Sequence, residues 1–110
     1  MNQNKISEAV KVAICICAED GLVSESEEAM VYQLISEKFP DYSKDAFIKA
    51  VDDFFSSKLQ IEDYLAAITD REMQKFTLEL SKVSAGIDGL DFRENVAIEK
   101  ASMYWKLRHE

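Results

Sequence analysis

Acidic side chains around two Asp-Gly turns are the residues of this chain whose types and spacing could do chemistry. Four of them, two at each turn, are candidate cation ligands: Asp20, Glu27, Asp88 and Glu94. Carboxylate oxygens are the ligands that hard cations such as Ca²⁺ and Mg²⁺ use in proteins. Neither stretch is an EF-hand loop, because the alternating carboxylates and the Glu at the twelfth position are missing.

Two interpretations of Asp20 and Asp88 stay open. A carboxylate at the end of a helix opposes the helix macrodipole by about 0.3–1 kcal/mol, so something nearby should offset it. We expect both side chains to accept hydrogen bonds from amides of the turn or the next helix, as Asp often does in tight loops. In the alternative interpretation, Asp20 and Asp88 belong to an acidic site together with Glu27 or Glu28 and with Glu94. That site binds a hard cation or a basic partner.

The two turns have the same design. In each, a Gly follows the Asp and fits the left-handed position just past a helix end, where a side chain would clash. Ser24 and Glu27 have the spacing of a capping box, and so do Asp91 and Glu94, so each pair predicts the start of a helix. The sequence therefore predicts two helical hairpins with other helices between them.

The first turn also carries a family resemblance. The pattern Ala-x-Asp-Gly-x-hydrophobic-Ser-x-x-Glu, from Ala18 to Glu27, resembles the hallmark of the tellurite-resistance protein B (TerB)-like domain family. Residues 85–94 resemble a second, weaker copy, in which Ile87 replaces an expected polar residue and the turn is one residue shorter. The resemblance implies one all-helical TerB-like domain over residues 1–110. It further implies an acidic face suggested to bind metal, here the four carboxylates named above, and a role beside tellurite-resistance, phage-resistance and stress systems.

Composition narrows the class of partner. The 110 residues are 47% hydrophobic and include only 3 Gly and 1 Pro, which favours a single domain of long helices. A net charge of −8 argues against direct binding to nucleic acid or to an anionic membrane. We expect a protein partner with a basic surface and a chain that is a monomer or a weak homo-oligomer. The partner should contact an acidic surface formed by Glu25, Glu27, Glu28, Asp88, Asp91 and Glu94.

Catalytic machinery is not expected. The single His, His109, lies near the end of the sequence, and no nucleophile with a neighbouring base can be assembled around it. Cys15 and Cys17 point about 200° apart on a helix and lack further Cys partners, so we expect two reduced, buried thiols rather than a disulfide or a zinc site. No secretory signal or membrane-spanning run is evident, and a cytoplasmic protein is expected.

Three classes of function follow. The first is a non-enzymatic TerB-like accessory domain that docks a protein partner; it requires no cofactor, but its acidic turns can receive Ca²⁺ or Mg²⁺. The second is an acidic helical inhibitor, an immunity protein or a nucleic-acid mimic, which engages a basic enzyme such as a nuclease. The third is a small carboxylate metalloenzyme.

We expect the helices that position the acidic turns to form a compact orthogonal bundle of about six. Residues 6–18 are apolar on nearly every side and predict a central, buried helix. A helix beginning near Asp70 should bury one seam, made of Met73, Phe76, Leu80, Val83 and Ile87. The last helix, from residue 92 to about 107, should pack on two sides through Val96, Ile98, Ala101, Met103, Tyr104, Trp105 and Leu107.

Overall fold

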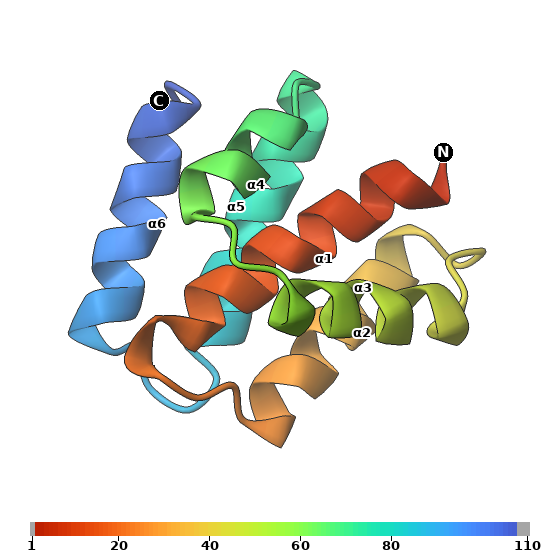
Figure 1. Cartoon of the computed structure of the whole chain (residues 1–110), viewed down its shortest axis with the longest axis horizontal. Coiled ribbons are helices and arrows are strands. Elements are labelled where there is room, and N and C mark those ends of the chain that lie inside the picture. Colours follow the sequence, from red (N-terminus) through yellow and green to blue (C-terminus); the bar gives the residue numbers. More distant parts are fainter. Residues whose placement is uncertain (1, 108–110) are drawn as a thin grey trace.

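The computed structural model describes residues 2–107, and this part of the chain contains helices and no strand. In chain order the elements are α1 (Gln3–Cys17), the 3₁₀ turn η1 (Ala18–Asp20), α2 (Glu25–Lys38), α3 (Lys44–Ser56), α4 (Ile61–Ala67), α5 (Arg71–Ala85) and α6 (Phe92–Tyr104). The predicted all-helical fold with six helices is confirmed (Figure 1).

α1 is the central element of the molecule. Its residues Val12, Ile14 and Ile16 are fully buried although alternate positions point to different sides of a helix. The helix is surrounded because α2, α3, α4, α5 and α6 all pack against it, and Figure 1 shows it crossing the middle of the bundle. The near-uniform apolarity of this stretch therefore predicted its place correctly.

The core has two halves that meet on α1. One half joins α1 to α4, α5 and α6, and within it the indole Nε1 of Trp105 donates to the carbonyl oxygen of Leu65 at 2.9 Å. The other half joins α1 to α2 and α3 through Val31, Ile35 and Phe47. α1 contributes buried residues to both halves of the core, so the surrounding helices all pack against one side of it or the other.

The ends of the helices follow local rules. Side-chain oxygens of Ser43 and Asp70 accept hydrogen bonds from backbone amides in the first turns of α3 and α5. α2 begins directly after Ser24, as its capping box predicts, and ends at Lys38. These boundaries could be predicted because a cap depends on residues within one turn of it.

The predicted seam of α5 is partly wrong. Met73 and Leu80 are buried as expected, but Val83 and Ile87 are exposed. Toward the end of the helix the buried positions belong to Ser81, Ser84 and Ala85. Small side chains let helices approach closely, and α5 packs against α1 more extensively than any other pair of helices in the described residues. Small side chains therefore occupy the buried positions near the end of α5, in place of the predicted large apolar ones.

α6 packs on one side, and the predicted two-sided packing is wrong. Ala97, Ile98 and Ala101 face the core, whereas Val96 and Met103 are exposed. Tyr104 is exposed as well, and the helix ends there rather than at residue 107. In Figure 1, α6 lies at the edge of the bundle with other elements on one side only.

The central position of α1 can be tested at Ile14. Replacing Ile14 by Ala should lower the free energy of unfolding by about 2–5 kcal/mol, because the side chain is fully buried and leaves a cavity. The matched control is Ile48→Ala on the exposed side of α3, which should cost less than about 1 kcal/mol. Urea unfolding followed by circular dichroism measures both, and equal losses would show that α1 is not the centre of the core.

Candidate functional site at the junction of the two acidic turns

The two Asp-Gly turns, far apart in sequence, lie side by side. The hydroxyl Oγ of Ser24 donates to Oδ2 of Asp88 at 2.5 Å and accepts from the amide of Glu27 at 3.0 Å. A serine hydroxyl has one proton to donate, and here it goes to the other turn. Figure 1 shows the α1–α2 and α5–α6 connections adjoining at one end of the bundle. We call this region the acidic junction: Asp20, Ser24, Glu27, Asp88, Asp91 and Glu94.

Both glycines have the left-handed conformation that the sequence predicts, but only Gly21 directly follows a helical element. The residue that caps the end of α5 is Gly86, so Gly89 lies three residues farther along the chain than predicted. Gly21 and Gly89 have φ angles of 98° and 92°, in the left-handed region that favours Gly. Oδ1 of Asp20 accepts from the amide of Leu22 at 3.1 Å, which confirms the turn interpretation for that side chain. Asp88 differs, since its hydrogen-bond donor is the serine hydroxyl of the first turn rather than an amide of its own turn.

Both predicted capping boxes are present, and each buries its Glu. Oε1 of Glu27 accepts from the amide of Ser24 at 2.9 Å, and Oε1 of Glu94 accepts from the amide of Asp91 at 3.0 Å. Only 3% of Glu27 and 1% of Glu94 is exposed. Their predicted place on an exposed acidic surface is therefore wrong, because each side chain folds back to cap its own helix and is buried.

Glu94 is the electrostatically unusual residue of the site. Its second oxygen, Oε2, is buried and has no hydrogen-bond partner among the described residues. Burial, the neighbouring carboxyl of Glu27 and the charge of Asp20 together raise the pKa of Glu94 to about 7, and the hydrogen bond from the Asp91 amide lowers it in part. The positive ends of α2 and α6 oppose this cost, since each Glu lies in the first turn of its helix.

Cys17 is a buried residue next to the acidic junction, and the shift in the pKa of its thiol shows which carboxylates lie near it. Burial raises the pKa of its thiol strongly, followed by the negative charges of Glu27, Glu94, Asp20 and Asp88. The four predicted ligands thus all act on one buried sulfur atom. Even so, within residues 2–107 no three His, Cys, Asp or Glu side chains are arranged to hold a metal ion. The metal site therefore stays a prediction. Its four residues lie near one another, but their carboxylates do not surround a single position where an ion would bind.

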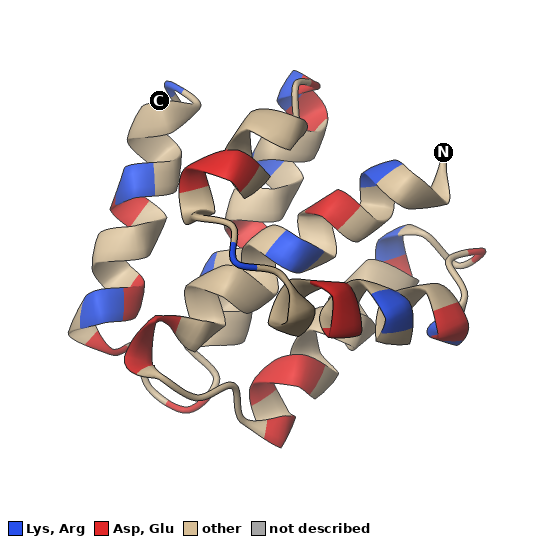
Figure 2. Ribbon diagram, viewed as in Figure 1, with Lys and Arg blue, Asp and Glu red and all other residues tan. Residues whose placement is uncertain are grey.

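The predicted partner-binding acids lie farther out. Glu25 is exposed, and Glu28 is half-buried. Both line a hollow of about 270 Å³ between α2 and α3, whose wall includes Tyr32, Phe47 and Lys44. Figure 2 shows acidic residues along the two turns and the first turn of α2.

Asp91 forms an ion pair with a neighbouring side chain, that of Arg93. Oδ1 of Asp91 lies 3.2 Å from Nε of Arg93, and hydrogen bonds from the Arg93 amide and side chain hold the pKa of Asp91 below its usual range. The sequence analysis did not anticipate this pairing. The signal was present, because Arg93 follows Asp91 by two residues.

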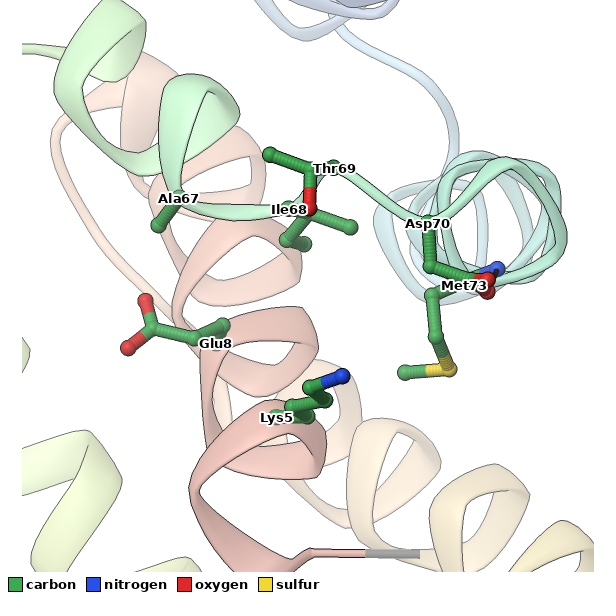
Figure 3. Close-up of a pocket in the computed structure, with 7 residues that line it drawn as sticks. All are labelled: Lys5, Glu8, Ala67, Ile68, Thr69, Asp70 and Met73. Carbon is green, nitrogen blue, oxygen red and sulfur yellow. Dashed lines mark hydrogen bonds between the residues drawn. The ribbon is translucent and has the colours of Figure 1, made fainter.

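A small cavity lies away from the acidic junction. A cavity of about 30 Å³ lies where Lys5 and Glu8 of α1 approach Met73 and the α4–α5 connection (Figure 3). It is at the opposite end of α1 from the acidic junction and is too small for an organic substrate. Its other lining residues are Ala67, Ile68, Thr69 and Asp70.

The two thiols are free and buried, as predicted. Burial, with lesser contributions from Glu19 and Glu62, raises the pKa of Cys15 to about 12, so the unreactive thiol form dominates. His109 lies outside the described residues. None of the helices described here is both long and apolar enough to span a membrane.

We compared the chain with protein families, curated proteins and solved structures. No family model, no curated protein and no solved structure matches this chain. The resemblance to the TerB-like domain family therefore rests on the two Asp-Gly turns and their capping boxes.

The buried carboxyl predicts a pH-dependent stability. Glu94 is protonated in both states at low pH, but above its raised pKa the folded state must carry a buried charge, so its contribution falls as pH rises from about 4 through about 7. Glu94→Gln stays neutral and should gain stability relative to wild type between about pH 5 and about pH 8. Urea unfolding in the presence of EDTA measures this difference.

The control for that prediction is Glu72→Gln, at an exposed position in the first turn of α5. Its stability relative to wild type should change little over the same pH interval. If Glu94→Gln behaves like Glu72→Gln, the Glu94 carboxyl is not held in a desolvated environment.

Proposed function

We propose that this chain is a non-enzymatic TerB-like accessory domain of a bacterial stress, tellurite-resistance or phage-resistance system. It docks a protein partner with a basic surface, and its acidic junction receives Ca²⁺ or Mg²⁺. The observation that carries the proposal is the buried, unpartnered Oε2 of Glu94 beside a second buried carboxyl, that of Glu27. Two adjacent buried carboxyl groups require a compensating positive charge, either a proton or a cation.

Hydrogen bonding leaves ligand oxygens for a cation. Asp20, Glu27, Asp88 and Glu94 each use one carboxylate oxygen in a hydrogen bond that holds a turn or a cap. The second oxygen of each takes no part in these bonds and can coordinate a cation without breaking the turns. The contact between the carboxyl groups of Glu27 and Glu94, which helps to raise the pKa of Glu94, gives way to the cation. Four carboxylate oxygens completed by water suit Ca²⁺ or Mg²⁺, which take oxygen ligands. A modest approach of the two turns must accompany binding, because the groups do not yet surround one point.

The hollow beside Glu25 and Glu28 supports the partner part of the proposal. Two carboxylates stand beside two aromatic rings, a combination that favours the charged head and apolar stem of Lys or Arg. Lys44 of this chain already places its ammonium 4.1 Å from the ring centroid of Tyr32. This surface therefore accommodates a cation, and the outer carboxylates can attract a second one from a partner.

The acidic inhibitor remains the second candidate because the net charge is −8 and Glu25 is exposed. It would bind a basic enzyme in a salt-sensitive manner, and that binding would not depend on divalent cations.

The cation is tested by thermal unfolding with added Ca²⁺ or Mg²⁺. Wild type should be stabilised by mass action, about 2.7 kcal/mol at a concentration about a hundred times the Kd. The gain should be larger at about pH 8 than at about pH 6, because a proton on Glu94 competes with the cation. Asp20→Asn keeps the oxygen that accepts from Leu22 but removes the charge, and should lose most of the gain.

The matched control is Asp41→Asn, an exposed acid in the α2–α3 connection. It should keep the full response to the cation. Wild type without any gain, or Asp20→Asn with the same gain as wild type, would leave the turns with a structural role only.

The partner surface is tested by charge reversal at Glu25 and Glu28. The double variant Glu25→Lys/Glu28→Lys should keep its helical circular dichroism and lose the protein that wild type captures from cell extract. Glu72→Lys/Glu79→Lys makes the same change in charge at exposed positions on α5 and should still capture it. Equal capture by all three proteins would contradict the proposed surface.

A further inference from the structure

The outer side of α6 carries apolar residues that nothing in the described chain covers. Phe92, Val96 and Met103 are 78%, 50% and 74% exposed. With Glu99 they are separated by four, three and four residues, a spacing that places them on one stripe of a helix. We call Phe92, Val96, Glu99 and Met103 the outer stripe.

The outer stripe lies opposite the packed side of the same helix. Ile98, Ala101 and Trp105 are buried in the core, and they occupy the other side of the helix by the same periodicity. α6 packs against α5, η1 and α1, and its buried residues all lie on the inner side. Lys100 also forms an ion pair with Glu62 of α4. Figure 1 shows no element beyond it. Single exposed apolar residues are common on proteins, but a stripe in register along a helix is typical of an interaction surface.

We propose that the outer stripe is a docking surface for a basic amphipathic helix of a partner protein, with a Lys or Arg of that helix opposite Glu99. The spacing is that of a short coiled-coil seam, in which apolar residues alternate at three and four positions. From Phe92 to Met103 the stripe is about 16 Å long, which matches about three turns of a partner helix. The proposal does not rest on the function proposed above.

Glu99 determines the charge of the occupant. It is exposed within the seam and has no salt bridge among the described residues. A partner that covers the stripe takes this carboxylate out of water, so a cation must face it. The neighbouring cations of α6 are already engaged, since Arg93 lies 3.2 Å from Asp91 and Lys100 lies 2.7 Å from Glu62.

A second copy of this chain fits the stripe poorly. An isologous contact would bury Glu99 from both copies against apolar side chains, with no free cation from either α6. Each copy would also bring a net charge of −8. A basic helix supplies apolar side chains and the missing positive charge together.

The test uses three synthetic peptides and wild-type protein. The first peptide repeats a heptad with Leu at a and d and Lys at e and g. The second replaces its Lys by Glu, and the third replaces its Leu by Ser. At near-physiological salt the first should bind saturably and shift the backbone amide resonances of Val96, Glu99 and Met103, and the other two should bind at least about tenfold more weakly.

Variants then locate the contact. Val96→Gln/Met103→Gln should weaken binding of the first peptide at least about tenfold, and Glu99→Gln about threefold or more. Ile48→Gln, at an exposed apolar position on α3, is the matched control and should bind as wild type does. None of these variants alters Glu25, Glu28 or the predicted cation ligands, so failure here is distinct from failure of the proposed function.

Several results would overturn the proposal. Equal binding of the basic and acidic peptides would show that charge plays no part, and equal binding of the Ser peptide would show that the apolar stripe plays none. Analytical ultracentrifugation of the same samples tests for self-association, and a dimer of wild type that Val96→Gln/Met103→Gln abolishes would assign the stripe to a second copy. Absence of saturable binding to the first peptide would also overturn it.

Discussion

The burial of α1 on all sides is the constraint on which the rest of the structure depends. A helix without a polar side must be surrounded, and here five other helices provide the cover. This requirement brings the end of α5 close to the end of α1, and the turns that follow the two helices meet over Cys17. The acidic junction is therefore a consequence of core packing, although each of its turns is specified locally.

The capping boxes explain why acidic residues enter the interior at that place. A Glu in the third position of a helix satisfies an orphan amide and interacts favourably with the helix dipole. The starts of α2 and α6 lie close together, so both Glu side chains are buried near each other. Each cap stabilises its own helix, but together the two caps place two carboxyl groups in a desolvated environment. The raised pKa of Glu94 is the measure of the cost of that desolvation. Ser24 offsets part of the repulsion between the turns by donating its proton to Asp88.

The sequence predicted the local features of this fold and the burial of α1, and missed several features that depend on distant contacts. The caps of α2 and α6 and the left-handed glycines follow from a few neighbouring residues, so they could be predicted. The burial of Glu27 and Glu94 could not, because it depends on two helix starts that are far apart in sequence. Periodicity also failed to decide which apolar side of α6 faces the core, since Val96 and Ile98 are both apolar but only Ile98 is buried.

The first turn of α6 connects the two surfaces of interest. Phe92, the first residue of the helix and one end of the outer stripe, lies between Asp91 and Glu94, which form the capping box. A change of charge at Glu94, by a proton or by a cation, therefore acts on the turn that also presents Phe92. Because capping stabilises a helix from its first turn, occupation of the acidic junction and order at the start of the outer stripe should favour each other. The physical link is the short segment from Asp91 to Glu94, which needs no movement of the core.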